Sequence, residues 1–246
     1  YNTATGFKAL HSNTTGDQNT AYGYLAFRDN TEGNFNTAFG SQSLRSNNTG
    51  SYNTACGYNT LLNNTTGFRN TAMGVYTLTR NTTGGYNTAY GGFALNLNTS
   101  GRTNTALGYD ALGSNTTSSD NIAIGHRALY TQSYNNSNTE WSSANLAIGD
   151  SCLFSNQPTS TSNGVHNTAV GHQSMKYNTI GLKNTAIGYY SMHSNTTGDY
   201  NAALGQISLW SNTGGNRNLA AGSAAMYNNI NGSRNSAGGY RALYSN

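Results

Sequence analysis

The sequence predicts an all-β fold, a parallel β-solenoid of about 14 turns with about 17 residues per turn. Three observations lead to this prediction. The pattern Asn-x-Ala-x-Gly recurs fourteen times, eleven of the thirteen spacings between copies equal the spacing from Asn2 to Asn19, and the Ala and Gly never vary. A repeat this short cannot bury an apolar face on its own, so consecutive copies are expected to stack.

Numbered from its first Asn, the repeat has the consensus N-T-A-x-G-x-x-A-L-x-x-N-T-T-G-x-x. Residues 1–246 therefore form a single repeat array. The other two spacings, from Asn121 to Asn145 and from Asn145 to Asn167, are longer and mark loop insertions near 131–144 and 156–166. Neither end carries the polar cap that the free end of a solenoid needs, which predicts an interior segment of a longer fibre.

The strands are expected at positions 3–4 and 8–9, since two strands and two turns fit within one repeat. Adjacent strand residues point to opposite faces, so each pair places a small side chain on one face and a large one on the other. The large residues at positions 4 and 9 would then form the core. The small face at position 8 would contact a neighbouring chain, which predicts an oligomer.

Asn at positions 1 and 12 predicts two ladders of stacked side-chain amides. The N-T-T-G tracts, such as those beginning at Asn13 and Asn195, are interpreted as turns and not as glycan acceptors. The predicted structural ladder residues are Asn2, Asn19, Asn36, Asn53, Gly6, Gly23, Gly40 and Gly57.

Composition argues against several functions. Charged residues make up 8% of the chain, and the twelve Lys and Arg are scattered, so no nucleic acid is expected as a partner. No apolar run of about 18 residues exists that could insert in a membrane. Cys56 and Cys152, five repeats apart, are expected to be small packing residues.

Catalytic and metal-binding chemistry are not expected either. The eight carboxylates fall at different positions of the repeat and form no acid–base pair. His126 and His172 share position 6 but lie two turns, or about 10 Å, apart, too far to share a metal. We therefore expect no enzyme activity and no cofactor.

Aromatic residues and the insertions supply the candidates for recognition. Tyr offers an apolar ring with a polar tip, which suits contact with sugars or proteins, although the rings could instead stack on each other along the repeats. The candidate aromatic surface stripe consists of Tyr24, Tyr58, Tyr76, Tyr109, Tyr189 and Tyr240. The candidate recognition loop in the first insertion consists of Tyr134, Glu140 and Trp141, with tolerated surface decoration as the alternative.

The strings NTAYGYLAF, NTAFGSQSL, NTALGYDAL and NTAIGYYSM, joined by NTTG turns, resemble repeats of bacteriophage tail-fibre proteins and related bacterial surface proteins. They are also similar to the head repeats of YadA-like trimeric autotransporter adhesins, whose motif is Asn-Ser-Val-Ala-Ile-Gly and whose period is shorter. This resemblance implies a left-handed parallel β-roll, three chains around one axis, and attachment from a virion or bacterial cell surface.

The predicted function is therefore that of an extracellular fibrous attachment protein, as the shaft or adhesive segment of a tail fibre or surface adhesin. A homotrimer with a cell-surface glycan or protein receptor is expected. Two alternatives remain open: a purely structural surface filament or spacer, and an ice-binding solenoid. The ice-binding alternative rests on the file of Thr at position 2, which extends from Thr3 to Thr105 and lapses at Ile122.

Overall fold

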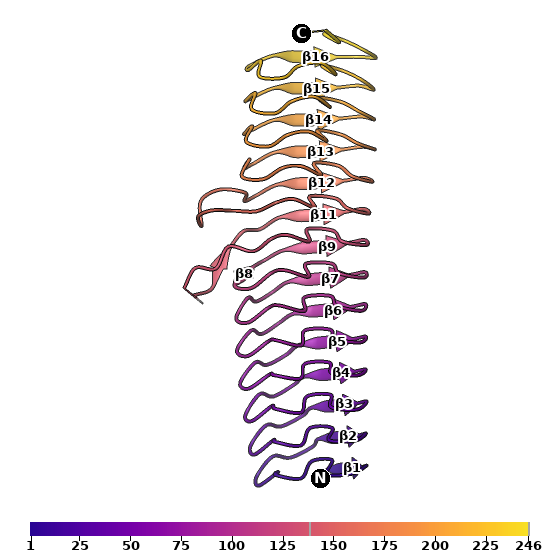
Figure 1. Cartoon of the computed structure of the whole chain (residues 1–246), viewed down its shortest axis with the longest axis vertical. Coiled ribbons are helices and arrows are strands. Elements are labelled where there is room, and N and C mark those ends of the chain that lie inside the picture. Colours follow the sequence, from indigo (N-terminus) through magenta and orange to yellow (C-terminus); the bar gives the residue numbers. More distant parts are fainter. Residues whose placement is uncertain (138, 246) are drawn as a thin grey trace. The chain divides into compact units, whose positions relative to one another are not determined.

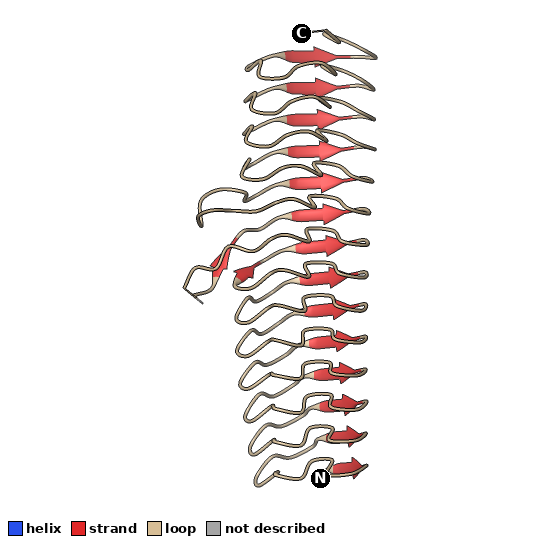
Figure 2. Ribbon diagram, viewed as in Figure 1, coloured by secondary structure: helices blue, strands red, loops and turns tan. Residues whose placement is uncertain are grey.

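The chain forms a parallel β-solenoid of about 14 turns with about 17 residues per turn, as predicted (Figure 1). Residues 1–137 and 139–245 of the computed structural model are described; Asn138, in the first insertion, and Asn246 lie outside them. The described residues contain strands, turns and bends and no helix (Figure 2). The class of protein that this fold defines is the repeat β-solenoid.

The described chain divides into two compact units. The first comprises residues 1–119 with 135–141, and the second comprises residues 120–134 with the described residues from 142 onward. The first unit contains β1 (Thr3–Thr5), β2 (Thr20–Tyr22), β3 (Thr37–Phe39), β4 (Thr54–Cys56), β5 (Thr71–Met73), β6 (Thr88–Tyr90), β7 (Thr105–Leu107) and β8 (Ser118–Ser119). The second contains β9 (Ile122–Ile124), β11 (Leu146–Ile148), β12 (Thr168–Val170), β13 (Thr185–Ile187), β14 (Ala202–Leu204), β15 (Leu219–Ala221) and β16 (Ser236–Gly238), while the short β10 (Trp141–Ser142) pairs with β8.

Apart from β8 and β10, neighbouring strands within each unit are parallel and in register, so equal repeat positions lie side by side. Ala21 pairs with both Ala4 and Ala38, for example. The insertions do not disturb this register, because Ala147 pairs with Ala123 on one side and Ala169 on the other. Side chains at the same repeat position therefore form a row along each compact unit, here called a file. A functional surface of this fold is expected to consist of one or more files.

Among the described residues, each turn forms a strand at positions 2–4 and none at positions 8–9, so the prediction of a second strand at positions 8–9 was wrong. The short β8 and β10 lie elsewhere, near the first insertion. The reason is the backbone of positions 7 and 9, which is left-handed in most turns although neither position is Gly. Leu25 and Phe27 have φ of 52° and 51°. The Leu25 N–H donates to Phe7 O of the preceding turn at 2.9 Å, and the Phe27 N–H donates to Ser43 O of the next turn at 2.8 Å. The stretch thus keeps inter-turn hydrogen bonds without extended geometry.

The core consists of positions 3, 8 and 9, and the prediction that position 4 belongs to it was wrong. Position 3 points inward, so positions 2 and 4 of the same strand both point outward. Tyr22, Phe39 and Tyr90 are 52%, 53% and 53% exposed, whereas Leu44 is fully buried. Position 8 is buried with Leu of position 9, because the left-handed residues on either side of it break the strand alternation. The small outer face expected at position 8 therefore does not exist.

Candidate functional site

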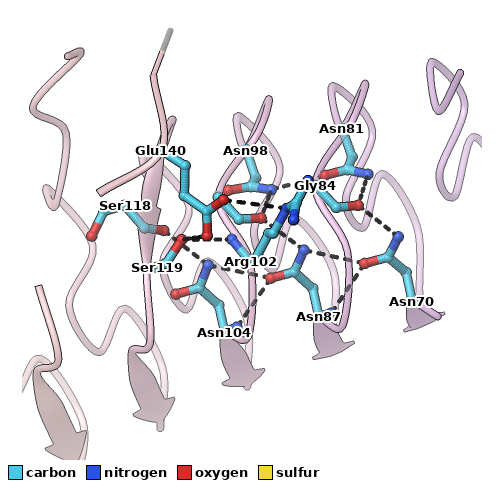
Figure 3. Close-up of polar contacts among 11 residues, drawn as sticks. Asn70, Asn81, Gly84, Asn87, Asn98, Arg102, Asn104, Ser118, Ser119 and Glu140 are labelled. Atoms are coloured by element: carbon cyan, nitrogen blue, oxygen red, sulfur yellow. Dashed lines mark hydrogen bonds and ion pairs between the residues drawn. The ribbon is translucent and has the colours of Figure 1, made fainter. Parts of the chain in front are cut away.

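Two ladders of buried Asn run through each unit, as the sequence predicted. At position 1, Asn87 Nδ2 donates to Asn70 Oδ1 of the preceding turn at 3.1 Å and to Gly101 O of its own turn at 2.9 Å. At position 12, Asn98 Nδ2 donates to Asn81 Oδ1 at 2.8 Å and to Gly101 O at 3.0 Å. Figure 3 shows both ladders beside one another, with Asn70 and Asn81 converging on Gly84. The ladders are a structural framework and leave the outer positions free to vary.

The predicted ladder residues take their expected places. Asn19, Asn36 and Asn53 are buried and bonded in sequence, and Asn2 accepts from the Asn19 backbone N–H. Gly6, Gly23, Gly40 and Gly57 at position 5 have φ between 126° and 138°. A Cβ on Gly23 would lie 2.6 Å from Gly40 O of the next turn, so the close stacking of turns requires glycine here.

The second insertion preserves the ladders. Gly164 O accepts from Asn145 Nδ2 at 2.8 Å and from Asn156 Nδ2 at 2.9 Å, which is the role of the position 15 glycine in a regular turn. The extra residues therefore loop out between position 12 and the acceptor glycine. Asn163 Oδ1 accepts the backbone N–H groups of Thr159 and Ser160 and closes this loop on itself.

The candidate recognition loop does not present its three residues together. Trp141 is only 7% exposed, so its side chain is part of the packed interior and not a contact surface. Glu140 lies 3.3 Å from Arg102 Nε and accepts from Ser119 Oγ at 2.9 Å (Figure 3). Tyr134 is half-buried and belongs to the second unit, while Glu140 and Trp141 belong to the first. These contacts support a structural role for the insertion.

The candidate aromatic stripe is exposed over most of its length but stacks on itself. Tyr24, Tyr58, Tyr109 and Tyr189 are 42–52% exposed, and Tyr240 is 75% exposed. Tyr58 contacts the half-buried Tyr76 edge-on, with ring centroids 5.5 Å apart. The remaining contacts within this surface are Phe7–Tyr24, Tyr76–Phe93, Phe93–Tyr109, His172–Tyr189 and Tyr189–Tyr190.

A second aromatic file, at position 10, was not identified from the sequence. His193, Trp210, Tyr227 and Tyr244 are stacked with centroid distances of 5.6, 5.3 and 5.1 Å. Their spacing of one repeat is visible in the sequence once position 10 is inspected. His193 is buried, and burial lowers the pKa of its imidazole to about 4.

The histidines at position 6 are joined by a carboxylate. Asp150, on the turn between them, lies 2.8 Å from His126 Nδ1 and 3.4 Å from His172 Nδ1. Among the described residues, no group of three or more His, Cys, Asp or Glu could hold a metal ion. The described part of the chain also lacks any helix long and apolar enough to cross a membrane.

The edge formed by positions 16 and 17, here called the 16/17 edge, carries an open groove in each unit. The groove of the first unit has a volume of about 340 Å³ and is lined by Thr49, Ser51, Tyr52, Thr66, Phe68 and Arg69. The groove of the second has a volume of about 450 Å³ and is lined by Asp199, Tyr200, Asn216, Arg217, Ser233 and Arg234. In both, an aromatic side chain is followed one turn later by an arginine.

The outer face of the sheet is the other large feature of the surface. Position 2 presents exposed threonines from Thr3 to Thr88, and position 4 presents bulky apolar side chains such as Phe39, Leu107 and Ile187. Tyr22 and Phe39 stack with ring centroids 5.0 Å apart. Within each unit the face is therefore an ordered, half-apolar surface, and no described segment of the same unit covers it.

Comparisons with known proteins found no counterpart. A scan against protein-family models, a search of curated proteins and a search of solved structures gave no match to this chain. The function must therefore be inferred from the geometry of the files and grooves.

Proposed function

We propose that this chain is part of an extracellular, non-enzymatic attachment protein carried on a virion or bacterial cell surface, as the shaft or adhesive segment of a tail fibre or adhesin. The observation that carries this proposal is the uncovered outer face of the sheet, where the same two repeat positions, 2 and 4, are presented at every turn. A surface of this kind suits many similar weak contacts, with other copies of the chain or with a receptor, whose combined strength grows with their number.

The same face supports a homotrimer. Contiguous exposed apolar surface usually marks an interaction site, and the position 4 file supplies it with side chains that are 40–53% exposed, such as Leu204 and Phe39. We propose that copies of the chain pack through this file. This replaces the contact through position 8 that the sequence suggested.

The test of this function combines assembly with attachment. Light scattering should give the mass of three chains, and the purified trimer should bind whole bacterial cells or a glycan array. A trimer that binds neither would favour the spacer function over adhesion. A monomer in solution at all concentrations would remove the basis for both the fibre and the adhesin.

An ice-binding function has one observation in its favour. Thr20, Thr37, Thr54, Thr71 and Thr88 are exposed and in register on the outer face of the first unit. The neighbouring position 4 file contains Tyr, Phe, Cys and Met instead of a second threonine file. Thermal hysteresis measured on the intact chain decides this alternative, and we expect none.

A further inference from the structure

Five consecutive turns of the second unit carry a basic or aromatic residue at position 17. This basic file consists of His166, Lys183, Tyr200, Arg217 and Arg234. All five side chains are exposed. The sequence shows the basic residues as scattered, but the repeat spacing brings them to the same edge, one turn apart.

The register of the file is fixed by the backbone. Each residue donates its N–H to the position 16 carbonyl of the preceding turn: Lys183 to Val165 O at 2.9 Å, Tyr200 to Leu182 O at 3.1 Å and Arg217 to Asp199 O at 3.0 Å. Inter-turn spacing in a parallel sheet is about 4.8 Å. The cationic groups are therefore held on a rigid edge at regular intervals.

The cations are oriented without being neutralised. Lys183 Nζ lies 5.3 Å from the Tyr200 ring centroid, and Arg217 Cζ lies 5.7 Å from it, from the turns on either side. A cation over an aromatic ring is positioned by the ring quadrupole but keeps its full charge. No carboxylate of the described residues forms an ion pair with Lys183, Arg217 or Arg234.

The one carboxylate in the groove is directed to the backbone. Asp199 Oδ1 accepts the Leu182 N–H at 2.9 Å. The groove therefore combines the permanent positive charges of Arg217 and Arg234 with one negative charge, and adds the Asn216 amide, the Ser233 hydroxyl and the Tyr200 hydroxyl as neutral hydrogen-bonding groups. Lys183 adds a third positive charge beside the groove, near the Tyr200 ring. Hydroxyl and amide groups beside cations suit a ligand that carries both hydroxyls and acidic groups.

We propose that the basic file of the second unit binds acidic polysaccharide, with Lys183, Arg217 and Arg234 contacting its carboxylate or sulfate groups and Asn216 and Ser233 contacting its hydroxyls. This inference rests on the proposed attachment function and names the class of its ligand. An extended glycan, lying along the file, would meet a cation or the Tyr200 hydroxyl at every turn from 183 to 234. Nucleic acid fits less well, because single strands bind through several aromatic rings, whereas Tyr200 is the one tyrosine of the file, with no Phe or Trp beside it in the file, and has two cations within 6 Å of its ring centroid.

The first unit provides an internal contrast. There, Arg69 is the single cation between two rings, 5.5 Å from the Tyr52 centroid and 5.4 Å from the Tyr86 centroid. It donates to the Tyr86 hydroxyl at 2.8 Å, as Lys183 of the second unit does to the Tyr200 hydroxyl at 3.4 Å. The next arginine at this edge, Arg102, is paired with Glu140. The first unit therefore lacks the row of unneutralised cations, and acidic ligands should prefer the second.

The experiment compares three forms of the full chain: the natural sequence, the variant Lys183→Gln/Arg217→Gln/Arg234→Gln, and a control variant Lys8→Gln/Arg80→Gln/Arg127→Gln. The control removes the same charge from exposed positions outside the file. Binding is measured at several salt concentrations to heparin, polygalacturonate, neutral dextran and double-stranded DNA. Circular dichroism and thermal unfolding check that all three forms fold.

We expect the natural chain to bind heparin or polygalacturonate more tightly than dextran and DNA, with an affinity that falls as salt rises. The file variant should lose about tenfold or more of this affinity, and the control variant should retain it within about twofold. Equal losses in both variants, absence of acidic-glycan binding, or equally tight binding of DNA would overturn the inference. If the file variant still attaches to cells as the natural chain does, only the inference fails; if no form attaches or assembles, the proposed function fails as well.

Discussion

At the scale of single residues, two neighbouring glycines show how strictly the stacking of turns selects its sequence. Gly91, at position 5, has φ of 126°, and a Cβ on it would lie 2.6 Å from Gly108 O of the next turn. Gly92 has no such φ, and its Cβ would make only ordinary contacts, 3.5 Å to the Tyr109 side chain and 3.8 Å to Val75 O. At position 5, the positive φ and the short distance to the next turn both require glycine. This explains why the chain never places another residue there.

The substitution Gly91→Ala should lower the free energy of unfolding by about 2 kcal/mol or more, because it forces a non-glycine residue into a strained φ and against a backbone carbonyl. Gly92→Ala should change it by about 0.5 kcal/mol or less. Chemical denaturation of both variants checks the difference. Equal effects of the two substitutions would contradict the argument from stacking.

The two cysteines differ in exposure and should differ in reactivity. Cys152 is fully buried, burial raises the pKa of its thiol to about 12, and its Sγ–H donates to Ala169 O at 3.2 Å. Cys56, on the outer face of the sheet, is half-buried. Since the thiolate is the reactive form, iodoacetamide should modify only Cys56 in the folded chain and both cysteines in denaturant. Mass spectrometry of the alkylated peptides checks this, and modification of native Cys152 would show that the core opens.

At the scale of elements, the Asn ladders are the feature that holds register within each unit. In the regular turns the position 15 carbonyl accepts two side-chain amides, and most of these amides also donate to the turn before, as Asn87 and Asn98 do besides donating to Gly101 O. These groups are fully buried, so replacing one Asn removes a donor to the position 15 carbonyl and also the acceptor of the next turn's backbone N–H, as Asn87 Oδ1 is for the Asn104 N–H at 3.0 Å. A slip of one turn preserves the ladder, but a slip of one residue destroys it.

Replacement of Asn87 by Ala should therefore cost about 1–3 kcal/mol, the usual cost of unsatisfied buried polar groups together with a small cavity. Asn63→Ala, at an exposed position of the repeat, serves as the control and should be nearly neutral. The measurement is the denaturant midpoint of each variant. Similar midpoints for the two would mean that water replaces the ladder bonds at little cost.

The aromatic file at position 10 should make stability depend on pH through His193. Its pKa in the folded chain is about 4, lowered first by burial and then by the charges of Lys176 and His172. The unfolded chain, with a pKa near the ordinary value of 6.5, binds the proton more readily. Stability should therefore fall as pH falls from about 6.5 to about 4, and change little above that range.

The variant His193→Phe keeps the stacking with Trp210 and removes the proton site. Its free energy of unfolding, measured against pH, should decline less than that of the natural chain, with a difference on the order of 2 kcal/mol developing between pH about 6.5 and about 4. The difference between the two curves isolates the contribution of His193, because the other titratable groups are the same in both chains. Parallel curves would show that folding does not lower the pKa of His193.

Sequence periodicity was enough to predict the solenoid, the number of turns and the Asn ladders, because in-register stacking places the same residue types beside one another in successive turns. Periodicity was not enough to assign the backbone conformation of positions 7 to 9 in each turn. Leu25 and Phe27 give no sign of left-handed backbone, which is uncommon for such residues, and only stacking makes it tolerable. Once that conformation is known, the burial of position 8 and the exposure of position 4 both follow.

At the scale of the whole molecule, function resides in files whose members lie far apart in the sequence. The tyrosines at positions 6 and 7 could be predicted as a surface because one residue type recurs there. The basic file could not be found in the same way, because His166, Lys183 and Arg217 are of different types and stand out only when equal repeat positions are compared. A search of every repeat position for shared charge, in place of shared identity, would have found it.

The proposed assembly makes the last prediction, which concerns the outer face of the sheet. Phe39 and Tyr90, at position 4, are each 53% exposed, and Tyr58 and Tyr109, at position 6, are 42% and 49% exposed. Lysine at a contact between chains must be desolvated or repelled, whereas lysine on a free surface costs little. The double variant Phe39→Lys/Tyr90→Lys should therefore dissociate the trimer, and Tyr58→Lys/Tyr109→Lys should not.

The mass measured by light scattering across a dilution series distinguishes the two variants, and circular dichroism checks that both retain the fold. A trimer unchanged by lysines at position 4 would mean that the chains meet elsewhere. The outer face would then be free to bind a receptor or ice along its threonine and aromatic files. A trimer lost only with those lysines would assign the sheet face to assembly and leave attachment to the 16/17 edge, where the basic file of the second unit lies.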